Sequence, residues 1–210
     1  MKHEWRKKEK AIYLPKTIPE LISVPPYKYV TLSGKGHPAS TEFSDKIGVL
    51  YNISYAIRMM PKSGFTPDGY YEYTVYPLEG LWDLTEEGKR LKTFDKNELM
   101  YTIMIRQPDF VTDEIFEMAY KSVKKKKNPN YLDDLRFETI EDGLSVQMMH
   151  HGSYDNEPQS FAQMKQYIED HNLILTTLKH REIYLSDFRK TEPDKLKTVL
   201  RYTSLLRDKD

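Results

Sequence analysis

A glutamate alternates with apolar residues near the end of the chain, in the segment HREIYLSD at positions 180–187. Successive side chains of a β-strand point to opposite faces, so Glu182 and Tyr184 share one face, and Ile183 and Leu185 share the other. The pattern predicts a strand that packs its apolar face on a core. The carboxylate on the opposite face could bind a cation, orient a water molecule or act as a general base. An ordinary solvated sheet face would show the same alternation.

Other kinds of reactive site find little support in the sequence. There is no cysteine, so thiol nucleophiles, thiolate metal sites and disulfides are excluded, and no Gly-x-Ser-x-Gly segment is present. His150 and His151 are adjacent, which on a strand turns them to opposite faces, and together with His180 they fit no known metal motif. We therefore expect no metal and no cofactor.

The composition argues against several classes of partner. The 210 residues hold 32 basic and 32 acidic side chains, whereas a dedicated nucleic-acid binder needs a basic surplus. No apolar run approaches the roughly 20 residues that span a bilayer. We expect a cytoplasmic protein that contacts neither membrane nor nucleic acid directly. The aromatic content of 12 % fits either an aromatic pocket or amphipathic core edges.

The first half of the chain predicts a β-α-β-β module. A strand is expected over residues 28–34, and an amphipathic helix from Thr41 that stops before Pro61. A tyrosine-rich strand follows over residues 69–77, and a partner strand over 99–105. Glu79 falls at the corner after the tyrosine-rich strand, where we expect its side chain to hydrogen-bond the backbone.

The second half repeats this order. A helix over residues 112–127 and a break at 128–130 separate the halves, and residues 146–152 then echo residues 30–36. A helix over about 160–171, the strand with Glu182 and a strand over 198–204 follow. The repeat predicts a duplicated domain. Its expected organisation is a leader over 1–20 and one domain over 21–206, with module one over about 21–107, a linking helix over about 112–127 and module two over about 135–206.

Two segments carry a family resemblance. Residues 180–190 and 193–202 look like the C-terminal signature of the GyrI-like small-molecule-binding family, and YEYTVYPLEGLW at 71–82 resembles its central motif. Phe188 stands where the family usually has a proline, which affects the turn rather than the pocket. The resemblance implies an α+β fold in which two β-α-β-β modules, related by a pseudo-twofold axis, enclose a ligand cleft between two antiparallel sheets.

The resemblance also implies site residues. Glu182 matches a glutamate of the family's ligand pocket, and Trp82 matches an aromatic residue that could stack on a planar ligand, although it could equally fill the core. Tyr71 is expected to act beside Glu182. The other expected ligand-binding residues are Tyr73, Tyr184, Met104, Met149 and Tyr202.

Three functions fit this family. Some stand-alone members hydrolyse cyclopropane-bearing, DNA-alkylating natural products; here Glu182 would orient or deprotonate a water, and Tyr71 would donate a hydrogen bond to the conjugated carbonyl. Other members sense or sequester planar aromatic, often cationic, compounds as part of transcription regulators that also carry a DNA-binding unit. In this sequence only about 20 residues precede the expected domain, which is too few for such a unit. A third possibility is a protein partner, as for the gyrase inhibitor that names the family. The first function, detoxification by hydrolysis, is the leading hypothesis.

Overall fold

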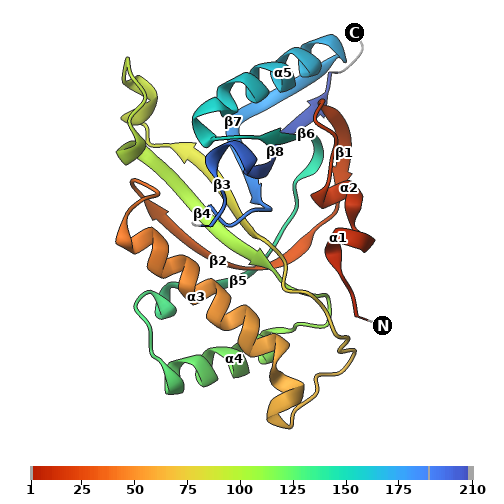
Figure 1. Ribbon diagram of the computed structural model, residues 1–210, viewed down its shortest axis with the longest axis vertical. Coiled ribbons are helices and arrows are strands. Elements are labelled where there is room, and N and C mark those ends of the chain that lie inside the picture. The colour runs from red at the N-terminus through yellow and green to blue at the C-terminus, as the bar shows by residue number, and fades with distance from the viewer. Residues whose placement is uncertain (1, 189, 208–210) are drawn as a thin grey trace. The chain divides into compact units, whose positions relative to one another are not determined.

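The structure is a computed structural model that describes residues 2–188 and 190–207. Met1 of the expected leader and Arg189 of the C-terminal signature lie outside the described residues. The fold is α+β, with eight antiparallel strands and three main helices among the described residues (Figure 1). The chain forms two compact units: unit 1 holds residues 2–5, 27–78 and 84–140, and unit 2 holds 6–26, 79–83, 141–188 and 190–207.

Unit 1 is built on three antiparallel strands, with the first in the middle. Its elements are β2 (Tyr27–Lys35), α3 (Thr41–Arg58), η1 (Met60–Ser63), η2 (Gly88–Arg90), η3 (Lys96–Glu98), β4 (Leu99–Arg106), α4 (Asp113–Lys126), η4 (Leu132–Asp134) and β5 (Arg136–Ile140). Strand β2 pairs with both β4 and β5. Helix α3 packs on β2 and β4 and lies beside α4 (Figure 1).

Both long helices of unit 1 begin near the predicted positions and have side-chain caps. The Ser40 side chain accepts a hydrogen bond from the backbone N–H of Phe43, and the Thr112 side chain accepts one from Ile115. These bonds satisfy N–H groups that the first helical turn leaves without partners. None of the helices in residues 2–188 and 190–207 is long and apolar enough to cross a membrane.

Unit 2 consists of a sheet with one long helix. Its elements are α1 (Trp5–Lys8, from residue 6 on), α2 (Lys10–Tyr13), β1 (Glu20–Val24), the central residues of β3 (Leu78–Leu84), β6 (Gly143–His151), η5 (Tyr154–Asn156), α5 (Glu157–Asp170), β7 (Leu173–Tyr184), η6 (Pro193–Lys195) and β8 (Lys197–Leu206). The strand order is β1-β6-β8-β7-β3. Helix α5 lies across β6, β8 and β7 (Figure 1).

Both faces of this sheet are covered. The register pairs Glu182 with Leu200, and Leu200 with Met148, on one face. Helix α5 packs on that face over a core of Val146, Met148, Met164, Ile168, Leu173, Leu200 and Tyr202. Ile183 and Leu185 are buried on the opposite face, as predicted. The alternative interpretation of the alternation, an ordinary solvated sheet face, is wrong, because α5 packs on the Glu182 face and Glu182 is buried.

The predicted strand over residues 69–77 is also wrong. The backbone there forms only an isolated bridge between Tyr73 and His3, and the strand begins later, at Leu78. The tyrosine-rich segment instead exchanges backbone hydrogen bonds with His3, which donates to Glu72 at 2.6 Å and accepts from Thr74 at 2.9 Å. The segment expected to form a corner after the strand is therefore itself strand β3.

Candidate functional site

Glu182 is buried on β7, with both carboxylate oxygens held by neighbours on the same strand face. The residue is 8 % exposed to solvent. The Tyr184 hydroxyl donates a hydrogen bond to Oε2 at 2.8 Å, and His180 Nε2 lies 3.1 Å from Oε1. The three residues are spaced two apart, so the strand's alternation brings them together. The result is a carboxylate held in one orientation.

Trp82 extends this arrangement from the neighbouring strand β3. Its indole N–H donates a hydrogen bond to the Tyr184 hydroxyl at 2.7 Å, and the Tyr184 hydroxyl in turn donates a hydrogen bond to Glu182. Burial raises the pKa of Tyr184, and the Glu182 carboxylate raises it further, so Tyr184 remains a hydrogen-bond donor. Trp82 is buried, and its polar edge is used within the protein. It positions Tyr184, a role that the sequence did not indicate.

Gly80 makes room for that indole. A Cβ atom on Gly80 would lie 2.7 Å from Trp82 Nε1 and 3.2 Å from the Tyr184 hydroxyl oxygen. A separation of 2.7 Å is much shorter than a van der Waals contact, so only glycine leaves the hydrogen bond undisturbed.

His180 faces an oxygen acceptor with each ring nitrogen. Nδ1 lies 3.2 Å from the Leu178 carbonyl oxygen, and Nε2 lies 3.1 Å from Glu182 Oε1. A neutral imidazole carries one N–H and can donate only one of these bonds, whereas an imidazolium donates both. Both ring nitrogens of His180 therefore have an oxygen acceptor on the same strand within hydrogen-bond distance. The Phe161 ring packs on the imidazole with its centroid 4.6 Å away.

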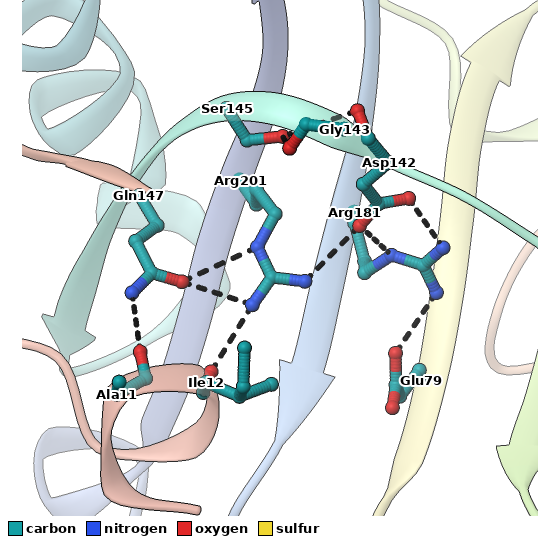
Figure 2. Close-up of polar contacts among 9 residues, drawn as sticks. All are labelled: Ala11, Ile12, Glu79, Asp142, Gly143, Ser145, Gln147, Arg181 and Arg201. Atoms are coloured by element: carbon teal, nitrogen blue, oxygen red, sulfur yellow. Dashed lines mark hydrogen bonds and ion pairs between the residues drawn. The ribbon is translucent and has the colours of Figure 1, made fainter. Parts of the chain in front are cut away.

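The other face of β7 carries a different polar cluster, shown in Figure 2. Arg181 donates two hydrogen bonds of 2.7 Å to Asp142 and one of 2.8 Å to Glu79. Arg201 donates to Asp142 at 3.0 Å, and also to Gln147 and to the Ile12 carbonyl oxygen. Two arginines thus face two carboxylates.

Charge compensation fixes the protonation state in this cluster. Burial alone would raise the pKa of Asp142, but the adjacent Arg181 and Arg201 guanidinium groups outweigh it and lower the pKa below its usual range. Glu79 was expected to hydrogen-bond the backbone at a corner. That expectation is wrong for Oε2, which pairs with Arg181 across two adjacent strands.

The structure distributes the remaining predicted residues. Tyr202 pairs with His180 in the register and so shares the Glu182 face, where burial raises the pKa of its hydroxyl to about 12. Met149 pairs with Val199, which pairs with Ile183, and therefore lies on the opposite face. Tyr71, Tyr73 and Met104 belong to unit 1.

In unit 1, Tyr71 and Tyr73 belong to an aromatic cluster. Their ring centroids lie 6.3 Å apart, and the Phe110 ring lies 5.5 Å from Tyr71 and 6.0 Å from Tyr73. Burial raises the pKa of Tyr73. Met104 is fully buried on β4. Their place beside a ligand stays a prediction.

Three residues near Glu182 were missed. His180 could have been found, because a residue two positions before Glu182 shares its face. Tyr154 lies just before α5, and Glu157 is the first residue of that helix. An acidic residue at a helix start is usually solvated and interacts with the helix dipole, so the sequence pattern does not predict that Glu157 is buried. Across the described ranges, no group of three or more histidine or acidic side chains is placed to hold a metal ion.

Comparison with known families is decisive for the identity of the fold. The sequence model of the GyrI-like small molecule binding domain matches residues 18–202. The chain belongs to the GyrI-like family. No curated protein sequence matches it. As a GyrI-like protein, it carries a small-molecule-binding domain.

Solved structures agree. A hydrolase from Listeria innocua is 38 % identical, with a TM-score of 0.90 over 98 % of this chain and 100 % of that one. A second hydrolase structure from Listeria innocua is 36 % identical, with a TM-score of 0.88 over 97 % and 100 %. The C-terminal domain of EcmrR, 14 % identical with a TM-score of 0.56 over 90 % and 97 %, shares the fold. This GyrI-like protein is therefore similar over its length to proteins described as hydrolases.

Proposed function

We propose that this GyrI-like protein binds planar hydrophobic or cationic aromatic molecules and hydrolyses cyclopropane-bearing, DNA-alkylating natural products, which detoxifies them. The observation that carries the proposal is the buried Glu182 carboxylate, whose two oxygens are held by His180 and Tyr184. The full-length similarity to two Listeria hydrolases supports a hydrolytic reaction. The family's small-molecule-binding domain supports the class of ligand.

In the proposed reaction, Glu182 orients a water molecule and accepts one of its protons. The water oxygen forms a bond to a cyclopropane carbon as the strained C–C bond breaks. The electron pair of that bond moves through the conjugated system to the carbonyl oxygen, which takes up a proton. Water is added overall, and no oxidant or reductant is required. Holding the base in place before the reaction lowers the barrier, because no orientation has to be found in the transition state.

Other parts of the proposal rest on the family resemblance. They are the duplication of a β-α-β-β module, a ligand cleft between its two copies, and a hydrogen bond from Tyr71 to the substrate carbonyl. The contribution of Trp82 is now more specific. Because its N–H is bonded to Tyr184, we propose that it acts by orienting the Tyr184–Glu182 pair and by offering its ring to the ligand.

The test is to incubate wild type and Glu182→Gln with a cyclopropane-bearing alkylator and follow water addition by mass spectrometry. Glutamine keeps the shape and most hydrogen bonding but cannot accept the proton, so turnover should fall about 10²–10⁴-fold while binding survives. Glu169→Gln, at an exposed position of α5, is the matched control and should behave as wild type.

The possible results separate the candidate functions. Wild type that binds such compounds without opening the ring would be a sensor or sequestration module. Wild type that binds no planar compound would leave a protein partner such as gyrase as the better hypothesis. Equal turnover by wild type and Glu182→Gln would show that Glu182 is not the base.

A further inference from the structure

A second carboxyl group lies buried near Glu182 and has no role in the reaction described so far. Glu157 is the first residue of α5 and is 7 % exposed. Its Oε1 atom is buried and finds no hydrogen-bond partner in the part of the chain that the structure describes. A buried polar atom without a partner is costly, so it needs an explanation, such as a bound ligand or a catalytic task.

The neighbours of Glu157 along the chain show where it points. Tyr154, three residues before it, packs edge-on against the Tyr184 ring with centroids 6.1 Å apart. Phe161, four residues after it, packs on His180 at 4.6 Å. Residues three or four apart share a helix face, so Glu157 lies between these two contacts. Tyr184 and His180 are the two residues that hold Glu182, and the face bearing Glu157 is therefore turned toward that carboxylate.

The surroundings of Glu157 decide its charge. Burial raises its pKa to about 10, and the nearby Glu182 and Asp155 carboxylates contribute to the rise. The N-terminus of α5 favours the ionised form, but this effect is too small to overcome burial beside two negative charges. Tyr184 and Tyr154 also face this region. The pKa of Tyr154 is raised mainly by burial and further by the nearby carboxylates of Glu182, Glu157 and Asp187. These surroundings favour the neutral carboxylic acid form of Glu157.

We propose that Glu157 is the proton donor of this site and the counterpart of the Glu182 base. This inference rests on the proposed hydrolysis and completes its proton balance. As water attacks and Glu182 accepts the water proton, the electron pair of the broken C–C bond reaches the carbonyl oxygen, and Glu157 gives that oxygen its proton. Glu182 then carries a proton and Glu157 a negative charge, and proton exchange restores both. Two carboxyl groups kept in different protonation states are a recurrent means of combining acid and base catalysis.

The test compares wild type with Glu157→Gln, which keeps a neutral side chain of the same shape but has no acidic proton to give. Turnover should fall about 10²-fold or more while binding of a planar ligand is retained, and Glu169→Gln should again match wild type. Wild-type kcat should also decline at alkaline pH as Glu157 ionises. The residual activity of Glu157→Gln should lack that decline.

A second measurement does not depend on activity. At about pH 8 an ordinary glutamate is ionised, so a carboxylic-acid carbonyl stretch in the infrared spectrum of wild type that disappears in Glu157→Gln would identify the neutral acid. Absence of that band overturns the inference. Wild-type turnover that is unchanged in Glu157→Gln also overturns it and leaves the proposed function intact. Wild type without any turnover overturns the proposed function as well, so the two failures are distinguishable.

Discussion

The two faces of β7 hold carboxyl groups in opposite ways. On the face of Arg181, Glu79 and Asp142 pair with guanidinium groups, which keep their protons at any ordinary pH. On the face of Glu182, the hydrogen-bond partners are the His180 imidazole and the Tyr184 phenol, and the buried Glu157 carboxyl group lies nearby. Neighbouring residues of one strand thus belong to a cluster of fixed charge and a cluster of exchangeable protons.

We interpret this difference as a separation of a structural task from the proposed chemical one. Fixed opposite charges, bidentate at Asp142, specify one arrangement of β3, β7 and β8, and they lose much of their interaction if any member is removed. Exchangeable protons give weaker positional control but permit proton transfer. We interpret the Arg181 face as support for the Glu182 face, since alternating residues of the same strand carry the two faces.

The largest expected effect on stability comes from breaking the fixed-charge cluster. Arg181→Met removes the arginine that bonds both Glu79 and Asp142 and leaves Arg201 on Asp142, which should lower the free energy of unfolding by about 3–5 kcal/mol. Chemical denaturation measures this. Lys165→Met, at an exposed position of α5, is the control and should shift the free energy by less than about 0.5 kcal/mol. A similarly small loss for Arg181→Met would contradict a structural role for the cluster.

The two faces should also respond to pH with opposite sign. Glu157 has a raised pKa of about 10, so the folded protein binds more protons than the unfolded chain above the ordinary glutamate pKa. Stability should therefore fall as pH rises toward 10, by up to about 1.4 kcal/mol per pH unit from this group. Glu157→Gln should remove that decline and be more stable than wild type at alkaline pH.

Asp142 provides the opposite arm of the same experiment. Its pKa is lowered in the folded state, so its contribution to stability is present above the ordinary aspartate pKa and is lost as pH falls through the folded value. Glu157→Gln should leave this acid limb unchanged. Denaturation of both proteins across the pH range measures the two slopes, and identical alkaline slopes would show that Glu157 is not neutral in the folded protein.

A smaller effect is expected at Gly80. Gly80→Ala places a methyl group against the Trp82 indole, which should cost about 1–3 kcal/mol and disturb the Trp82–Tyr184 hydrogen bond. The emission of Trp82 should change with it, as should turnover. Gly48→Ala, in the interior of α3 where nothing lies within 4 Å of the new methyl group, should instead stabilise by about 0.5–1 kcal/mol. If the emission of Trp82 is unchanged in Gly80→Ala, the sheet accommodates the methyl group without disturbing the Trp82–Tyr184 hydrogen bond.

The sequence predicted those features that depend on local periodicity. The helix starts near Thr41 and Thr112 follow from the change to a helical period, and the shared face of Glu182 and Tyr184 follows from strand alternation. The same rule extends to His180, whose importance was overlooked. Local pattern therefore sufficed for the part of the site that lies on one strand.

Features that depend on distant partners could not be predicted in this way. The start of β3 at Leu78 was missed because the preceding tyrosines alternate as a strand would, while their backbone hydrogen bonds go to His3. The salt bridge from Glu79 to Arg181 joins residues that are 102 positions apart. Glu157 resembles a surface residue at a helix start, and only its burial near Glu182 in the folded protein reveals it as a buried acid.

The central claim is that carboxylates on the Arg181 face hold the fold, whereas those on the Glu182 face serve chemistry. The most direct test makes the same carboxylate-to-amide change on each face and measures the free energy of unfolding at neutral pH. Glu79→Gln should lose about 3 kcal/mol or more, because Arg181 loses a buried partner. Glu182→Gln should stay within about 1 kcal/mol of wild type, because glutamine can still accept from Tyr184. Equal losses in the two variants would contradict the account.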